Sequence, residues 1–361
     1  MHRVLARLAL LVLALWVLAT PARGQGRMER LFYYVDRESS WKSLVAHIDQ
    51  IDVVAPGAYR VDEDGIVWGE VDPRVLKLAA EHQVEVWPLL VNIGERSFDQ
   101  ELLHELLSNE SARASAIRTL VDQARRHGYA GIQIDFENVS IRDRDALTTF
   151  YRELADALHA AGKKVSIAVV HRPDEFAGPT TYHKWLLDSW RGGYDVKALA
   201  DAGDFVTVMT YSQHTRRTPP GPQAGIPWVR EVVAWFLHEG VPPEKLSMGI
   251  PTGSQRWYTS WESRIEPELA RSYSEQLSHA WALGHAERHE AGWTWDDTQK
   301  VAFTYYPRGG TFEWIFLEDA RSFRAKLDVV REFGLRGFSV WVLGPEDPAI
   351  WDVLEGEPAA R

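Results

Sequence analysis

Hydrophobic and polar positions follow a repeating order along the chain, in which short apolar runs alternate with longer stretches of helical spacing. The apolar runs predict β strands at 31–35, 51–55, 84–91, 132–137, 164–170, 205–210, 246–250 and 337–341. The stretches between them predict helices at 39–50, 72–82, 99–107, 111–127, 142–161, 182–190, 195–201, 227–239 and 318–333. No tight hairpin joins successive strands of this set. The order therefore predicts an α/β fold, the parallel (β/α)8 or TIM barrel.

The fourth predicted strand has one apolar and one polar face. Its two-residue period separates Ile132, Ile134 and Phe136 from Gln133, Asp135 and Glu137. Carboxyls two positions apart on a strand lie roughly 6–7 Å apart, and one charge then raises the pKa of the other. A solvated acidic surface strand is the alternative, but barrel strands are covered by helices, and a buried carboxyl pair costs several kcal/mol. The pair is a candidate acid–base site.

One stretch interrupts the alternation of strands and helices. Residues 252–312 separate the seventh strand from its helix and are too long for an ordinary loop. Residues 301–306 and 311–317 predict a hairpin within or beside it. The stretch also contains five tryptophans, Trp257, Trp261, Trp281, Trp293 and Trp295. We expect a small α+β insertion that walls one side of the cleft, rather than a second domain.

The N-terminal residues 1–24 have the layout of a secretory signal peptide. Arg3 and Arg7 precede an apolar run at 8–19, and small residues at 22–24 offer a cleavage point. The run is shorter than the ~20 residues of a membrane-spanning helix, and an uncleaved anchor is the alternative. We therefore expect residues 25–361 to form the catalytic barrel of a secreted protein, or of one in the periplasm or cell envelope.

Composition narrows the classes of partner. The chain of 361 residues has no cysteine and a formal net charge of −11. The absence of cysteine excludes disulfides, a lipidated cysteine and cysteine-based metal sites. The negative charge argues against nucleic acids and anionic membranes as partners. Sixteen tryptophans are many. Such rings stack on the apolar faces of sugars, although most are expected in the core.

Two further groups of residues give weaker signals. His285 and His289 have the i, i+4 spacing of a metal-binding helix face, but no carboxylate motif accompanies them. An exposed helix is the favoured interpretation, and we predict no metal and no cofactor. Residues 171–175 follow the fifth strand on the side of the candidate site. A solvated loop is favoured there over a role at the rim.

Residues 130–137 resemble the strand-four signature of glycoside hydrolase family 18, the chitinase-type barrels. Met209-Thr210-Tyr211, followed by His214, resembles the strand-six motif of that family. Residues 219–228, 241–251, 318–322 and 337–351 resemble its spore-germination-type branch. The similarity covers roughly residues 30–354, and the joint occurrence of these motifs at barrel spacing is specific.

The resemblance implies a role for each site residue. Glu137 protonates the glycosidic oxygen and then activates water, while the N-acetyl group of the substrate acts as the nucleophile, in a retaining mechanism. Asp135 orients that acetamide, and Tyr211 donates its hydroxyl to the acetamide oxygen. Trp341 forms the hydrophobic floor under the reacting sugar, although core packing is an alternative for Tyr211 and Trp341. The other substrate-binding residues implied are Gln133, Met209, Ser212 and Tyr33.

Three positions depart from the family pattern. Gln133 replaces an Asp or Asn, Ala130 replaces a polar residue, and Ser212 replaces the Asp that commonly follows the motif tyrosine. The favoured hypothesis is an exported, monomeric hydrolase of N-acetylhexosamine polymers, such as chitin oligomers, peptidoglycan or an exopolysaccharide. The departures motivate a second hypothesis, a weak or inactive carbohydrate-binding barrel of the cell envelope. A third is a cell-wall scaffold that binds a protein partner through its tryptophan-rich insertion.

Overall fold

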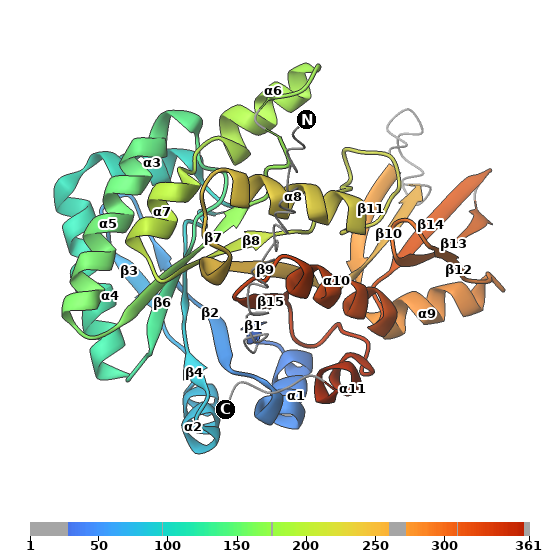
Figure 1. Cartoon of the computed structure of the whole chain (residues 1–361), viewed down its shortest axis with the longest axis horizontal. Coiled ribbons are helices and arrows are strands. Elements are labelled where there is room, and N and C mark those ends of the chain that lie inside the picture. Colours follow the sequence, from blue (N-terminus) through green and yellow to red (C-terminus); the bar gives the residue numbers. More distant parts are fainter. Residues whose placement is uncertain (1–27, 96, 175, 260–271, 309, 357–361) are drawn as a thin grey trace, which may run out of the picture.

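The computed structural model describes residues 28–95, 97–174, 176–259, 272–308 and 310–356, and its centre is a closed parallel barrel (Figure 1). The barrel strands are β1 (Glu29–Tyr34), β2 (Val53–Val61), β4 (Glu85–Val86), β5 (Leu89–Val91), β6 (Gly131–Asp135), β7 (Lys164–Val170), β8 (Phe205–Met209), β9 (Leu246–Pro251) and β15 (Gly337–Trp341). Their order is β1-β15-β9-β8-β7-β6-β5-β2, and pairing of β1 with β2 closes the ring. The predicted (β/α)8 barrel is confirmed.

The third barrel strand is divided, where the sequence predicts one continuous strand over 84–91. Pro88 has no N–H for a ladder, and it separates β4 from β5. Trp87 turns into the barrel interior, where its buried ring lies 5.3 Å from that of Phe205. Gly131 on β6 makes this possible, because a Cβ there would lie 2.7 Å from the Trp87 ring.

Helices cover the outside of the barrel. They are α1 (Glu38–His47), α2 (Pro73–His82), α3 (Gln100–Ser108), α4 (Glu110–Arg126), α5 (Arg144–Ala160), α7 (Val196–Ala202), α8 (Ile226–His238), α10 (Ala320–Glu332) and α11 (Ile350–Glu355). A further helix, α6 (Thr181–Leu186), lies in the segment between β7 and α7. Short turns flank the helices at η1 (Ile48–Gln50), η2 (Ile141–Asp143) and η4 (Pro243–Lys245), and η3 (Leu187–Arg191) is a π-helical turn. Side chains such as those of Asp99 and Asn109 accept backbone N–H groups at the helix starts. Among the described helices, none is long and apolar enough to cross a membrane.

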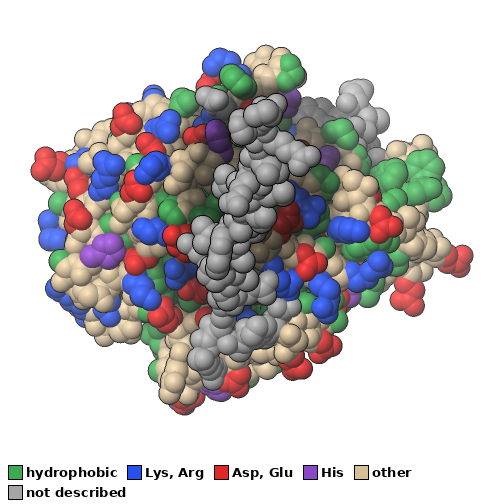
Figure 2. Space-filling model, in the orientation of Figure 1, with side chains coloured by type: hydrophobic (Ala, Val, Ile, Leu, Met, Phe, Trp, Pro, Cys, Tyr) green, Lys and Arg blue, Asp and Glu red, His purple; other side chains and the backbone are tan. Residues whose placement is uncertain are grey.

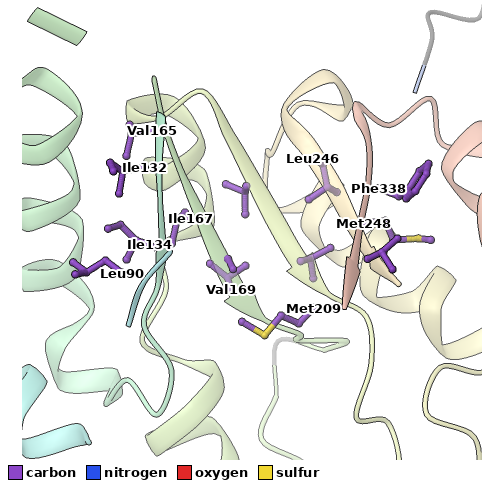
Figure 3. Packing of buried hydrophobic residues seen from close by; sticks show 14 of the residues in the cluster. Leu90, Ile132, Ile134, Val165, Ile167, Val169, Met209, Leu246, Met248 and Phe338 are labelled. Atoms are coloured by element: carbon purple, nitrogen blue, oxygen red, sulfur yellow. The ribbon is translucent and has the colours of Figure 1, made fainter. Parts of the chain in front are cut away.

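The main core lies between the strands and the helices. Ile132, Ile134 and Phe136 are fully buried in it, so the predicted apolar face of β6 points outward to the helices. Figure 3 shows Ile132 and Ile134 grouped with Val165 and Ile167 of the neighbouring strand β7. The polar side chains of β6 consequently point into the barrel.

The insertion after β9 is a separate antiparallel sheet, seen at the right of Figure 1. Its elements are β10 (Ser254–Thr259), β11 (Ser272–Leu277), α9 (His279–Arg288), β12 (Thr294–Asp296), β13 (Val301–Arg308) and β14 (Thr311–Leu317). The predicted insertion and its hairpin are present, and the sheet continues past the expected end at 312. Ala282 of α9 packs with Ala302 and Ile315 in a small core of its own. Glu318 donates its N–H to Ser254 Oγ at 3.1 Å, so the two ends of the insertion are adjacent.

One additional strand was not expected from the sequence. β3 (Val67–Gly69) pairs with the end of β2 in an antiparallel hairpin outside the barrel ring. On the face shown in Figure 2, acidic and basic side chains are interspersed. The predicted signal peptide at residues 1–24 lies outside the described residues.

Candidate active site

A cavity of about 570 Å³ opens at the C-terminal ends of the barrel strands, a size within the usual range for small-ligand sites. Of the eight site residues predicted from the sequence, those that line it are Tyr33, Asp135, Glu137, Met209, Tyr211, Ser212 and Trp341. The fold thus brings together side chains from β1, β6, β8 and β15, or from the residues that follow these strands. Active sites of this fold lie at the same end of the barrel.

The end of β6 positions the two carboxyls. Asp135 is the last residue of β6, and Glu137 follows two positions later. Between them Phe136 points outward, where its ring stacks at 5.7 Å on that of Phe150. Tyr194 donates its hydroxyl to the Phe136 carbonyl at 2.7 Å, which fixes the backbone between the two acids.

Asn92 holds the backbone of Glu137 from the neighbouring strand. It directly follows β5, is fully buried, and accepts the Glu137 N–H at 3.0 Å. Its amide donates to the Glu137 carbonyl at 2.9 Å and to the Asp99 carbonyl at 3.1 Å. Asn92 is not among the site residues predicted from the sequence. The available signal was a polar side chain at the C-terminal end of a predicted buried strand.

Burial controls the protonation of the carboxyl pair. Burial raises the pKa of Asp135 above its ordinary value. Burial and the neighbouring charge of Asp135 together raise the pKa of Glu137 well above its ordinary value. The charge of Asp135 therefore opposes ionisation of Glu137 and favours the protonated form of that carboxyl.

Two phenols stand beside the carboxyl pair. Burial raises the pKa of Tyr211, and the nearby charges of Asp135 and Glu137 raise it further. Burial likewise raises the pKa of Tyr33, with Asp135 as the adjacent charge. Both hydroxyls thus remain protonated donors. Gly249 on β9 leaves space for the Tyr211 ring, because a Cβ there would lie 3.0 Å from it.

Gln133 lies below the cavity instead of lining it. Its side chain is fully buried inside the barrel, and its amide nitrogen donates to Ser166 Oγ at 3.0 Å. The same nitrogen lies 3.4 Å from Thr207 Oγ1, which in turn lies 3.2 Å from Ser339 Oγ. This places Gln133 in a layer of hydroxyls beneath Asp135. The resemblance implied that Gln133 contacts the substrate directly. This position, outside the cavity lining, does not support such a contact.

Trp341 ends β15 and contributes an aromatic ring to the cavity wall. Its ring lies 5.4 Å from that of Tyr33. The peptide bond between Trp341 and Val342 is cis. Thr252 Oγ1 donates to the Val342 carbonyl at 2.7 Å and accepts the Val342 N–H at 2.9 Å. The ring is therefore placed by contacts from β1 and from the start of the insertion.

The favoured interpretation of residues 171–175 as a solvated loop is wrong for His171. This side chain is only 6% exposed and lines the cavity. Burial and the charge of Arg191 lower the pKa of His171 to about 3, so the ring is neutral. Its Nε2 accepts a hydrogen bond from Arg191 Nη2 at 2.8 Å. The contact joins two elements distant in sequence, and no local pattern signals it.

No group of His, Asp or Glu side chains that could hold a metal ion occurs in the described part of the chain. His285 lies on α9, and His289 caps the C-terminal end of that helix. The His289 ring stacks at 4.0 Å on that of Tyr306. His285 is partly buried, and His289 is exposed.

The geometry provides the components of acid catalysis at a polar bond. A buried, protonated carboxyl lies next to a second carboxyl and a phenol donor, and an aromatic ring contributes to the cavity wall. A parallel barrel that holds such a site at its open end defines the class of the protein, a barrel-type glycoside hydrolase. Within this class, residues 30–346 match the model of glycosyl hydrolases family 18. The chain belongs to that family.

Two curated relatives match about three quarters of this chain. The cortical fragment-lytic enzyme of Bacillus subtilis (strain 168) is 30% identical over 270 residues, which cover 74% of this chain and 59% of that enzyme. Chitotriosidase-1 of Mus musculus is 23% identical over 290 residues, which cover 72% of this chain and 58% of that protein. The chain thus spans less than two thirds of the length of these curated relatives.

Solved structures share the fold over nearly the whole chain. A chitinase from Chromobacterium violaceum ATCC 12472 is 25% identical with a TM-score of 0.79, covering 91% of this chain and 98% of that chain. The spore cortex-lytic enzyme SleL of Bacillus cereus is 22% identical with a TM-score of 0.80, covering 91% of this chain and 74% of that chain. At 22% identity, the similarity to SleL shows a shared fold only.

Proposed function

We propose that this protein hydrolyses β-linked N-acetylhexosamine polymers by a retaining mechanism in which the acetamide of the substrate is the nucleophile. The observation that carries the proposal is the buried pair at the end of β6, in which burial and the charge of Asp135 favour the protonated form of Glu137. One group can then donate a proton while the other accepts a hydrogen bond. Membership of family 18 supports the same assignment.

The proposed reaction has two steps. In the first, the Glu137 proton passes to the glycosidic oxygen as its bond to the anomeric carbon breaks, and the acetamide oxygen forms a new bond to that carbon. Asp135 accepts the acetamide N–H and stabilises the developing positive charge, while Tyr211 donates to the acetamide oxygen. In the second, water attacks the anomeric carbon, Glu137 takes a proton from it, and the acetamide oxygen leaves. Two inversions give net retention.

The proposal is tested by Glu137→Gln, which keeps the shape of the side chain and removes its proton. Release of reducing ends from chitin oligomers and from purified peptidoglycan should fall by roughly 10²–10⁴, the usual contribution of a general acid. A matched control is Glu101→Gln, because the Glu101 side chain is 74% exposed on the outer helix α3. Equal turnover by wild type and Glu137→Gln would end the proposal.

A carbohydrate-binding barrel without turnover is the second candidate. Gln133 motivates it, because an amide hydrogen-bonded to Ser166 cannot exchange a proton with Asp135 as a carboxylic acid can. In calorimetry, this alternative predicts binding of N-acetylglucosamine oligomers by wild type with no release of reducing ends over long incubation. Measurable turnover that depends on Glu137 excludes it.

We also infer that the protein is exported, from the signal-like residues 1–24. Fusion of these residues to a reporter that is active only outside the cytoplasm should give reporter activity. N-terminal sequencing of the exported product should then begin near residue 25. Reporter activity equal to that of a fusion lacking residues 1–24 contradicts export.

A further inference from the structure

The cavity has an uneven distribution of charge. Its two acidic side chains are the catalytic pair, Asp135 and Glu137. In the described lining, the other residues with permanent charge are all arginines, Arg191, Arg216 and Arg217. This is unexpected in a chain whose net charge is −11. We call these three arginines the basic wall, and the overall charge of the chain does not account for them.

Arg191 is the most buried of the three arginines. It ends the π-helical turn η3, a rare backbone form often found at functional sites. Its Nη2 donates to the neutral ring of His171 at 2.8 Å, and no described carboxylate forms an ion pair with it. Burial and the charge of Arg172 lower the pKa of Arg191. A half-buried guanidinium held by a neutral imidazole is thus left without a counter-charge, which is unfavourable unless a ligand supplies one.

Arg216 and Arg217 extend the basic wall toward solvent. Both are exposed on the segment that follows β8, and neither forms an ion pair with any described residue. The Arg217 guanidinium lies 4.9 Å above the Trp185 ring, which stacks at 5.8 Å on that of Tyr182. All of these residues line the same cavity. The basic wall therefore contains aromatic rings as well as guanidinium groups.

We propose that Arg191, Arg216 and Arg217 form an anion subsite, and that the preferred substrate is an N-acetylhexosamine glycan carrying carboxylates. The proposal deepens the proposed function and rests on it. A guanidinium presents N–H donors in a planar fork that matches a carboxylate, and this contact is stronger than one to a neutral hydroxyl. Chitin oligomers have no carboxylate. Glycans with a lactyl ether on alternate sugars, or with alternating uronic acids, have one every second residue.

The subsite is separate from the catalytic pair. Arg191 donates to His171 and forms no ion pair with Asp135 or Glu137. A substrate carboxylate bound by Arg191 therefore does not take the place of Asp135. It selects a sugar unit and leaves the proton of Glu137 available.

The test measures binding on the Glu137→Gln background, so that turnover does not interfere. The probes are chitotetraose, a peptide-free tetrasaccharide of alternating N-acetylglucosamine and N-acetylmuramic acid, the same tetrasaccharide with reduced carboxyls, and a hyaluronan tetrasaccharide. The acidic muramic tetrasaccharide should bind roughly tenfold or more tightly than its reduced form at low salt. The difference should shrink as ionic strength rises. Hyaluronan binding as tight as muramic binding assigns the subsite to carboxylates in general, and weaker binding assigns it to the lactyl group.

Variants locate the subsite. Arg191→Gln should weaken binding of the acidic tetrasaccharide by roughly 10- to 100-fold and binding of chitotetraose by less than about twofold. Arg217→Gln is the second variant, since an exposed side chain tolerates replacement, and a smaller selective loss is expected. The matched control is Lys184→Gln, because Lys184 lies on α6 but does not line the cavity. It should change neither affinity.

The outcomes separate this inference from the proposed function. Turnover of chitotetraose by wild type with equal affinity for the acidic and reduced tetrasaccharides overturns the anion subsite and leaves the hydrolase proposal intact. Selective binding of the acidic tetrasaccharide that is lost in Arg191→Gln, without turnover of any probe by wild type, supports the subsite and overturns the hydrolase proposal. Equal losses for acidic and neutral probes in a folded Arg191→Gln protein also overturn the subsite.

Discussion

Glu137 keeps its proton because the barrel mouth removes it from water and sets Asp135 beside it. The sequence sufficed to predict this pair, since the period of one strand puts both carboxyls on one face. It did not suffice for Asn92, His171 and Arg191. Asn92 contacts Glu137, which lies 45 positions away in the sequence, and His171 contacts Arg191, which lies 20 positions away. Such contacts depend on how the barrel closes, and local pattern carries no information about them.

The raised pKa of Glu137 has a consequence for stability. Above its ordinary value of 4.5 the unfolded chain loses this proton while the folded chain keeps it. The free energy of unfolding therefore falls as pH rises from that value through the raised folded pKa. Glu137→Gln, which has no proton to lose, should gain thermal stability over wild type as pH rises from about 4 to about 8. Scanning calorimetry at both pH values checks this, and a gap that narrows with rising pH contradicts the assignment.

Asn92 is expected to act by positioning Glu137. Asn92→Ala leaves the buried N–H and carbonyl of Glu137 without partners, at about 1–3 kcal/mol for each group. We predict a lower free energy of unfolding and a fall in kcat that exceeds any change in KM, because the acid loses its alignment and the sugar-binding wall is untouched. Urea denaturation and steady-state kinetics measure the two effects. A change confined to KM contradicts a positioning role.

At the scale of elements, the third barrel strand and β6 fit together, because a glycine on β6 leaves room for the tryptophan that follows β4. The sequence predicts a continuous apolar strand at 84–91, because Trp87 and Pro88 are as apolar as their neighbours. Pro88 breaks this strand, because it has no N–H for the hydrogen-bond ladder of the sheet. Trp87 then fills the barrel interior opposite Gly131. Similarly, the short strand β3 was not predicted. Three residues are too few for a periodic signal.

Gly131 should be intolerant of any side chain. In Gly131→Ala the new methyl group would lie 2.7 Å from the Trp87 ring and 2.8 Å from the Lys164 carbonyl oxygen. Overpacking of this kind lowers the free energy of unfolding by about 1–3 kcal/mol. The control is Gly292→Ala, where a Cβ meets no atom within 4 Å. Chemical denaturation compares the two, and equal stability of both variants would show that β6 can shift without loss.

At the scale of the whole molecule, the sequence predicted the barrel well because each of its repeating units has its own apolar period and boundaries. The insertion was predicted because it interrupts the alternation of strands and helices. Its hairpin was predicted from the pattern of residues 301–317. The pairing of β10 with β14 could not be predicted, since the two strands are far apart in the chain. The adjacent ends of the insertion, Ser254 and Glu318, explain how the barrel accommodates it between β9 and α10.

The adjacency of these ends predicts that the barrel folds without the insertion. Replacement of residues 256–316 by a short glycine linker should leave a cooperative thermal transition, because β9 pairs directly with β15. The insertion contributes Gln276 to the cavity lining, so KM should rise several-fold. Circular dichroism and kinetics on chitin oligomers provide the readouts. An aggregated or unfolded product would show that the insertion is an integral part of the barrel.

The central claim is that the acetamide of the substrate, and not a protein carboxylate, attacks the anomeric carbon while Glu137 supplies the proton. The most direct measurement is proton NMR of the first-formed product from an N-acetylated oligosaccharide, alongside the same oligosaccharide deacetylated at the reacting sugar. We predict the β anomer first from the acetylated substrate and no cleavage of the deacetylated one. Initial appearance of the α anomer, or equal cleavage of both substrates, would contradict the account.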